Sequence, residues 1–318
     1  MKAAVVERPS ELVVRDVPEP TINPWQALVQ IRACSICNHT DAEIVAGRFG
    51  GSAWPLILGH ESVGVVIRVG HRVSRYRVGD HVLRPGAMYN DPAVGIGSAW
   101  GGFAQLGIVG DTVAFLADNP AEKPHWSWEK QQIIPADIEP GEATAIITLK
   151  ETLSVLKRAC PPGTPAVAIV GTGPVAQSFA FWARYLEVPT VAVFGRREQW
   201  RATVMARGAT HYIVPGERAA LAAAQAQKIG PFPCVIEAVG SIAALQTAVS
   251  LVSPEGKVIP YGILPPAEEW PPFLQDARQR GLVGTAPVDE TITHDEVLHL
   301  VAAGRLRLAD WISHRLPL

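Results

Sequence analysis

Hydrophobic positions change their rhythm part-way along the chain. Up to about residue 145, short β-branched runs are broken by Gly, Pro and Asp, for example over residues 27–31, 62–67 and 80–83. This pattern is typical of an irregular antiparallel β domain. From about residue 146, apolar strands alternate with Ala-rich helical stretches, which predicts a parallel, doubly wound sheet with right-handed crossovers. The predicted strands cover residues 166–170, 190–194, 234–238 and 257–261.

The change of rhythm predicts a two-domain α/β protein. We expect a β-rich domain over residues 1–145, a nucleotide-binding domain over residues 146–284, and a C-terminal segment over residues 285–318. One uncharged stretch, residues 164–183, is long enough to be mistaken for a membrane span. The glycines and proline inside it, and its change from a β-branched run to a helical pattern, predict a buried strand and a buried helix instead.

Composition narrows the classes of function. Of the 318 residues, 48% are hydrophobic and 18% are charged, with a formal net charge of −2. These values are ordinary for a globular protein, and they provide no basic surface for nucleic acid or an anionic membrane. Four cysteines in a chain of this length do not make a disulfide framework and suit a reducing compartment. Because the start of the chain also lacks a signal-peptide pattern, we expect a cytoplasmic protein that acts on a small molecule.

A glycine-rich turn follows the strand predicted at residues 166–170. Residues 171–176 read Gly-Thr-Gly-Pro-Val-Ala, which fits the pattern G-x-G-x-x-G/A. The first glycine allows the tight turn, the second lets a pyrophosphate approach the backbone, and the following helix N-terminus favours negative charge. A plain glycine turn is the alternative, but the strand before it and the apolar helix after it favour a dinucleotide site. The predicted contacts are Gly171, Thr172, Gly173, Pro174 and Val175.

The end of the next predicted strand indicates which dinucleotide is bound. An NAD enzyme places an acidic residue about twenty positions after the turn, where it holds the ribose 2′-hydroxyl. This chain has Gly195-Arg196-Arg197 there. Glycine leaves room for a phosphate and guanidinium groups bind phosphate bidentately, so we expect NADP(H) to be preferred over NAD(H). Alternatively, both arginines are solvated surface charges, and Glu198 is the residue that could reverse the preference.

A second group of residues carries metal-binding chemistry. Cys37 lies in the first half of the chain, and Gly59-His60-Glu61 follows some twenty positions later. Thiolate, imidazole and carboxylate are the ligands of an open catalytic zinc site, in which water or substrate takes the fourth position. A redox pair of Cys34 and Cys37 is the alternative, but such a motif should start a helix beside a βαβ unit. We therefore expect zinc at Cys37, His60 and Glu61.

Together these segments resemble the medium-chain dehydrogenase/reductase superfamily, in its branch of zinc-dependent alcohol, polyol and sugar dehydrogenases. The resemblance covers most of the chain in the family's order: residues 1–6, 59–64, 78–82, 101–104, the glycine turn and 236–240. It implies a GroES-like catalytic domain followed by a Rossmann domain, in a homodimer or homotetramer. The implied reaction is hydride transfer between the nicotinamide and the carbon of an alcohol or carbonyl substrate.

The resemblance also implies roles for single residues. Asp41 would fix the tautomer of His60, and Thr40 would relay the proton of the substrate. Because three residues rather than the family's two separate Cys37 from Asp41, His39 is a second candidate for the relay; we favour Thr40. The implied contacts to the nicotinamide side are Thr152, Val239, Tyr261 and Ile263.

Three departures from the family pattern shape these expectations. Thr148 occupies the place of a fourth ligand, and a neutral threonine is a poor one. We therefore expect three residues plus water, unless Glu151 reaches in from one turn on. Residues 84–100 lack the four cysteines that hold a second zinc in many relatives, so we expect one zinc. The C-terminal segment is also shorter than in most relatives.

Two other functions stay open alongside a zinc-dependent, NADP(H)-linked oxidoreductase. A zinc-free quinone or enone reductase of the same superfamily would lack the Cys and Gly-His-Glu ligands, so the sequence counts against it. A catalytically silent NADPH-binding protein is the candidate from another class, since the fourth ligand and the C-terminal segment are altered. Loops that carry Trp54, Tyr89 and Trp100 would suit a moderately bulky or ring-shaped substrate.

Overall fold

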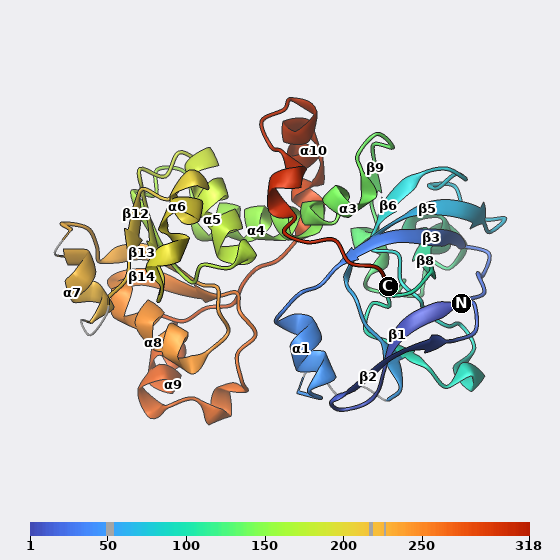
Figure 1. Ribbon diagram of the computed structural model, residues 1–318, viewed down its shortest axis with the longest axis horizontal. Helices are drawn as coiled ribbons and strands as arrows, with labels where there is room; N and C mark the ends of the chain where they lie inside the picture. Colours follow the sequence, from blue (N-terminus) through green and yellow to red (C-terminus); the bar gives the residue numbers. More distant parts are fainter. Residues whose placement is uncertain (49–53, 216–218, 226) are drawn as a thin grey trace. The chain divides into compact units, whose positions relative to one another are not determined.

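The computed structural model describes residues 1–48, 54–215, 219–225 and 227–318 (Figure 1). Within these residues the chain forms two compact units. The β-rich unit comprises Met1–Thr148 and His294–Leu318, and the parallel-sheet unit comprises Leu149–Thr293. Residues 285–293 therefore lie in the parallel-sheet unit, and the rest of the C-terminal segment lies in the β-rich unit.

Two sheets form the framework of the β-rich unit, among the residues that the structure describes. Their strand orders are β2-β1-β4-β7 and β8-β3-β5-β6-β9. All pairings are antiparallel except that of β4 with β7. The strands are β1 (Lys2–Arg8), β2 (Glu11–Asp16), β3 (Gln26–Ser35), β4 (Leu56–Ile57), β5 (Glu61–Val69), β6 (His81–Leu83), β7 (Gly97–Ser98), β8 (Leu106–Gly110) and β9 (Ile133–Ile134). The helices are α1 (Thr40–Val45), α2 (Thr112–Asp118), α3 (Pro140–Ala143), α10 (His294–Ala302) and the start of α4 (Ala145–Ala159).

Strand β1 is buried on both faces, which explains why it reads as an almost continuous apolar run. Ala3 and Val5 point into one core cluster, whereas Val6 packs with Ile44 and Leu56 in another. Successive side chains of a strand point to opposite faces of a sheet. A strand with a core on each side must therefore be apolar at consecutive positions.

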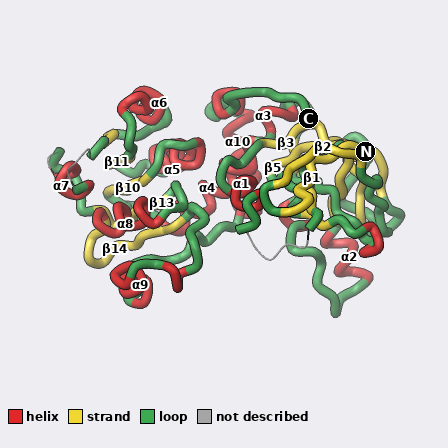
Figure 2. Tube along the Cα trace, turned by 60° about the horizontal axis from the view of Figure 1, so that its bottom comes forward, coloured by secondary structure: helices red, strands yellow, loops and turns green. Residues whose placement is uncertain are grey.

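The parallel-sheet unit holds the predicted doubly wound sheet. Its strand order is β12-β11-β10-β13-β14, and every pairing is parallel. Helices α5 and α6 lie on one side of this sheet, and α8 and α9 lie on the other (Figures 1 and 2). The strands are β10 (Ala166–Val170), β11 (Thr190–Phe194), β12 (His211–Ile213), β13 (Phe232–Glu237) and β14 (Val252–Pro260). The helices are α5 (Pro174–Tyr185), α6 (Arg201–Ala206), α7 (Ala220–Gln225), α8 (Ile242–Leu251) and α9 (Pro272–Gln279).

The apolar stretch at residues 164–183 is β10 followed by α5, as predicted. Proline at the first position of α5 is compatible with a helix start, because that backbone nitrogen needs no intrahelical partner. The helix then buries Ala176, Phe179, Ala180 and Ala183, a spacing of three and four residues that places all of them on one face. No helix among the described residues is long and apolar enough to cross a membrane.

A buried ion pair in the parallel-sheet unit fixes the segment that leads out of it. Lys150 Nζ, on α4, lies 3.3 Å from Glu290 Oε2, and both side chains are fully buried. Beside them the Thr293 hydroxyl donates a hydrogen bond of 2.8 Å to the backbone carbonyl of Lys150. These two contacts attach the short 3₁₀ turn Glu290–Thr293 to α4 just before α10 begins.

We expect the isosteric substitution Glu290→Gln to lower the free energy of unfolding by about 3–5 kcal/mol, because it leaves the Lys150 charge buried without its counter-charge. Chemical denaturation of the full chain measures this loss. The double variant Lys150→Met/Glu290→Gln removes both charges and should recover most of the stability. An unfolding midpoint of Glu290→Gln equal to that of the unmodified chain would contradict this account.

Candidate functional site

Asp41 organises the segment around the predicted ligand Cys37. It lies in the first turn of α1 and is 5% exposed. Its Oδ2 accepts a hydrogen bond of 2.9 Å from the backbone N–H of Cys37, and its Oδ1 lies 3.6 Å from Nδ1 of His60. The second distance is longer than a normal hydrogen bond, but Asp41 still raises the pKa of His60. The same carboxylate therefore positions one predicted ligand and faces another.

Gly59 provides the turn that presents His60. Its φ is +100°, and a Cβ there would lie 2.6 Å from the backbone nitrogen of Phe103. Only glycine fits such a position without displacing its neighbours. His60 follows at 8% exposure, immediately before Glu61 begins β5.

Two residues with unusual backbone conformations converge on His60. Arg84 has a φ of 60° and Trp100 a φ of 66°, in the left-handed region that bulky side chains rarely adopt. Arg84 Nη1 donates a hydrogen bond of 2.6 Å to the backbone carbonyl of His60. The Trp100 ring lies 5.3 Å from the imidazole, centroid to centroid. The cost of these conformations is of order 1–3 kcal/mol each, and it is consistent with a site that must hold one imidazole in place.

Cys37 and His60 influence each other's ionisation at the centre of this arrangement. Burial opposes ionisation of the Cys37 thiol, but hydrogen bonds with His60 and Thr40 outweigh it and lower its pKa. Burial likewise opposes the charge on His60, yet Asp41 and Cys37 raise its pKa to about 10. The protein groups by themselves thus favour a thiolate beside a cation. In Cys34, by contrast, burial raises the pKa well above the usual thiol value, which suits a neutral side chain.

Glu61, the third predicted ligand, is turned toward another residue. Its Oε1 accepts a hydrogen bond of 2.6 Å from the hydroxyl of Thr148. Thr148 is the residue at the place of the fourth ligand. Among the described residues, no group of three or more His, Cys, Asp or Glu side chains is assembled to hold a metal ion. The structure thus brings Cys37 and His60 together, with Asp41 behind them, and leaves Glu61 beside Thr148.

The two candidates for the proton relay lie in different surroundings. Thr40 helps to lower the pKa of the Cys37 thiol. His39 precedes α1 without capping it through its side chain, and it helps to lower the pKa of Glu43. Thr40 is therefore the candidate that acts on a predicted ligand.

The glycine turn has the geometry of an open cradle. Gly171 has a φ of +128°, and a Cβ on it would lie 3.1 Å from both the carbonyl oxygen of Ala238 and the side chain of Val239. Gly173 differs, because a Cβ there would meet no atom within 4 Å. Beyond Gly173 lies the N-terminus of α5, where backbone N–H groups favour an anion.

The strand end after β11 is shaped by Tyr212. Gly195 is required there because a Cβ would overlap the Tyr212 hydroxyl, which donates a hydrogen bond of 2.6 Å to the carbonyl of Arg197. The sequence suggested only room for a phosphate as the reason for this glycine. Glu198, the acid that could reverse the cofactor preference, forms an ion pair with Arg201.

A cavity of about 470 Å³ lies beside Arg196, at the carboxyl ends of β11 and β12. Its other walls include Val214, Pro215, Ala243 and Thr247. Ligands of open α/β sheets bind outside the carboxyl ends of the strands. A mainly apolar hollow with one guanidinium at its edge suits a flat base linked to a phosphate.

The four residues predicted to contact the nicotinamide lie in different surroundings. Thr152 is fully buried, and its hydroxyl is 2.5 Å from that of Ser178. Tyr261 donates a hydrogen bond of 2.9 Å to Glu151, so the carboxylate considered as a reserve zinc ligand is engaged within the parallel-sheet unit. Val239 is 40% exposed, and Ile263 follows the end of β14.

Sequence reasoning missed two residues that shape these sites. Glu237 is fully buried at the end of β13, and its Oε1 accepts hydrogen bonds of 2.8 Å from the backbone N–H groups of Val239 and Gly240. Arg84 is the other. Each is a charged residue at the end of an apolar strand, and that was the signal available in the sequence. Trp54, singled out for a substrate, packs against a core cluster with Trp100.

Comparison with protein families gives two matches. Residues 23–119 match the alcohol dehydrogenase GroES-like domain, and residues 174–302 match the zinc-binding dehydrogenase family. Similar curated proteins include sorbitol dehydrogenase of Bacillus subtilis, 29% identical over 87% of this chain and 79% of that protein. D-altritol 5-dehydrogenase of Agrobacterium fabrum is 23% identical over 96% of this chain and 89% of that protein.

Solved structures show the same fold at low identity. A protein from Sinorhizobium meliloti, described as a zinc-binding dehydrogenase bound to NADP, superposes with a TM-score of 0.75 at 24% identity, covering 96% of this chain and 89% of that one. Galactitol-1-phosphate dehydrogenase from Escherichia coli gives a TM-score of 0.74 at 18% identity, covering 97% and 90%. The predicted pairing of a GroES-like domain with a Rossmann-type parallel sheet is confirmed.

Proposed function

Since the chain belongs to the zinc-dependent alcohol dehydrogenase-like branch of the medium-chain dehydrogenase/reductase superfamily, we propose that it uses one zinc ion and prefers NADP(H). The family makes it an oxidoreductase of the alcohol, polyol or sugar dehydrogenase type, acting on a small molecule. The observation that carries the proposal is the arrangement around His60. Arg84 holds its backbone carbonyl, and its imidazole lies beside Asp41 and Trp100. The imidazole also lowers the pKa of the Cys37 thiol.

The donor chemistry of this arrangement fits zinc. A thiol with a lowered pKa beside an imidazole supplies two of the ligands that zinc prefers. Asp41 supports His60 from behind, as carboxylates support ligating histidines. Cys37 and His60 would hold the ion, and Glu61 would become the third ligand when its carboxylate leaves Thr148. The ion, when bound, supplies a Lewis acid that favours negative charge on a substrate oxygen.

The chain's own residues account for the other parts of the reaction. Thr40, beside Cys37, would take the proton of the substrate hydroxyl and pass it on. In the parallel-sheet unit, the cradle at Gly171–Gly173 would receive the pyrophosphate at the start of α5. Arg196, at the edge of the cavity, would bind the 2′-phosphate of NADP(H). The hydride chemistry itself is a property of the nicotinamide.

The two rival functions assign different roles to the predicted zinc ligands and to the cofactor cradle. A zinc-free reductase would give no role to the paired Cys37 and His60. A catalytically silent NADPH-binding protein would keep the cofactor cradle. The hydrogen bond between Glu61 and Thr148 suits both rivals, because it engages a predicted metal ligand. Zinc content separates the zinc enzyme from both rivals, and turnover of NADPH separates the reductase from the silent protein.

We expect elemental analysis to find one zinc per chain, and Cys37→Ser to lose it while Cys34→Ser keeps it. Thr148→Val should bind zinc at least about tenfold more tightly than the unmodified chain in competition with a chelator, because it removes the hydroxyl that donates to Glu61. The matched control Thr148→Ser keeps the hydroxyl and should behave like the unmodified chain. Two zincs per chain, or full occupancy in Cys37→Ser, would refute the ligand set. A folded chain that binds NADPH and no zinc would support one of the two rivals, and turnover of NADPH with a quinone or enone would then identify the reductase.

Cofactor preference should follow the arginines. We expect NADPH to bind more than about tenfold more tightly than NADH, since charge-assisted bonds to a phosphate contribute on the order of 1.5–3 kcal/mol. Arg196→Ala should erode the preference more than Arg197→Ala, because Arg196 lines the cavity while the Arg197 guanidinium lies 5.9 Å from the ring centroid of Trp200. Fluorescence titration of both cofactors measures this.

The control for the cofactor titration is Gly173→Ala. Its Cβ meets no protein atom within 4 Å, so the fold should be unaffected, while both cofactors weaken equally because they share the pyrophosphate. Equal affinities for NADPH and NADH in the unmodified chain would show that the arginines are only surface charges.

The proton relay should depend on Thr40. We expect Thr40→Val to lower turnover by about 10²-fold, the effect of losing a positioned acid–base group, with zinc and NADPH still bound. His39→Gln should cost little at neutral pH, because the relay is assigned to Thr40, which acts on the Cys37 thiol. Steady-state rates with a deuterated alcohol, with zinc content measured in each variant, test the pair. A larger loss in His39→Gln than in Thr40→Val would reverse the assignment.

A further inference from the structure

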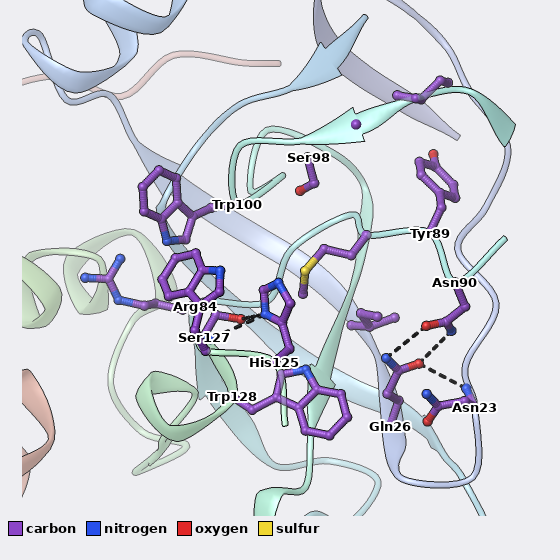
Figure 3. A pocket seen from close by; sticks show the side chains of 15 residues that line it. Asn23, Gln26, Arg84, Tyr89, Asn90, Ser98, Trp100, His125, Ser127 and Trp128 are labelled. Atoms are coloured by element: carbon purple, nitrogen blue, oxygen red, sulfur yellow. Dashed lines mark hydrogen bonds between the residues drawn. The ribbon is translucent and has the colours of Figure 1, made fainter. Parts of the chain in front are cut away.

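A second cavity, of about 400 Å³, lies in the β-rich unit (Figure 3). We call it the tryptophan groove, after Trp100, Trp126 and Trp128 in its wall. It shares Arg84 and Trp100 with the surroundings of His60, but none of the predicted zinc ligands, relay residues or cofactor contacts lines it. Its volume falls within the range of about 300–1,000 Å³ that is usual for small-molecule sites.

One end of the tryptophan groove is aromatic. The ring of Trp126 meets that of Trp100 edge to face at 5.4 Å, and Lys130 Nζ lies 4.9 Å from the Trp126 centroid. Despite these contacts, Trp126 remains 54% exposed. An indole that is held in place and still open to solvent can receive the apolar face of a ring.

The other end consists of side-chain amides (Figure 3). Gln26 is 3% exposed, and its Oε1 accepts hydrogen bonds of 2.8 Å from Asn90 Nδ2 and 3.0 Å from the backbone N–H of Asn23. Asn90 Nδ2 also donates to the carbonyl of Thr21 at 2.7 Å. These bonds fix the orientation of the amides before any ligand arrives.

His125 lies between the two ends and offers a hydrogen-bond donor. The backbone N–H of Ser127 donates to its Nδ1 at 3.4 Å, and the Ser127 hydroxyl is 2.8 Å from the same atom. Partial burial lowers the pKa of His125, which favours the neutral ring. Because Nδ1 then acts as an acceptor, the single ring proton lies on Nε2.

We propose that the tryptophan groove binds a neutral polyhydroxylated ring, such as a sugar. The C–H face of such a ring would stack on Trp126, and its hydroxyls would pair with His125 Nε2 and with the amides at the other end. A purely aromatic ligand would make no use of the hydrogen-bonding capacity that these groups still have. The described residues that line the groove include no Asp or Glu, and Arg84, its single cation, directs Nη1 to the carbonyl of His60. A charged ligand therefore finds no ready counter-charge among the lining residues.

The groove is independent of the proposed function, because it needs neither metal nor cofactor. We expect methyl β-D-glucopyranoside to bind the metal-free full chain in the absence of NADPH, with a millimolar dissociation constant. Its blocked anomeric carbon separates binding from turnover. Ligand-observed saturation-transfer NMR detects the contact, and a titration followed by tryptophan fluorescence gives the affinity.

Two variants and one control make the test specific. Trp126→Ala should weaken binding by about tenfold, since it removes the ring on which the ligand stacks. His125→Phe should also weaken binding while it keeps an aromatic ring. Phe273→Ala removes an aromatic residue of similar exposure from the parallel-sheet unit and should change nothing. Binding of zinc and of NADPH should be unaltered in all three variants. Failure of the unmodified chain to bind zinc or NADPH would therefore count against the proposed function and not against the groove.

Absence of saturable binding, or unchanged affinity in a folded Trp126→Ala, would overturn the proposal. Tighter binding of benzyl alcohol than of the glucoside at this groove would replace the sugar by an aromatic ligand, and would overturn it equally.

Discussion

The carboxylate of Asp41 connects the two ligand-bearing segments of the β-rich unit. One of its oxygens accepts the N–H of Cys37, which shapes the loop between β3 and α1, and the other faces the imidazole of His60. A buried carboxylate is costly unless donors and positive charge surround it. Here Cys37 supplies the donor and His60 the positive charge. The Asp41 carboxylate, which would be costly to bury alone, therefore determines where the thiol and the imidazole meet.

The loop formed by residues 84–100 has a comparable organising role. Residues 84–100 carry no cysteine, yet both ends of this loop act on His60, through the guanidinium of Arg84 and the ring of Trp100. Gly86 makes this possible, because a Cβ there would overlap the carbonyl of Trp100. The same Trp100 forms part of the tryptophan groove. One strained loop thus supports a predicted metal ligand and walls a second cavity.

Close packing shapes the predicted cofactor site of the parallel-sheet unit. Gly171 brings the turn against Ala238, and Gly195 lets the hydroxyl of Tyr212 reach the carbonyl of Arg197. A buried carboxylate, Glu237, holds the loop after β13 through two backbone N–H groups. These contacts leave Gly173 and the start of α5 open. The groups around the cradle are therefore packed or hydrogen-bonded to one another, and the cradle itself stays open.

The amino-acid sequence determined the elements and their class. Periods of two and of about 3.6 residues are local properties, so the strands around residues 166–170 and 190–194, the helix after the glycine turn and the change between the two units could be predicted. The spacing of Cys37 and His60 was also sufficient to expect that they meet. Tertiary structure decided the contacts between residues that are far apart in the sequence, because local patterns do not specify them. Thr148 reaches Glu61 across 87 positions, and Tyr261 reaches Glu151 across 110. The convergence of Arg84 on His60 and the gathering of the tryptophans likewise depend on how the strands and loops pack, because a side chain's partner across the fold is set by the packing and not by its neighbours in sequence.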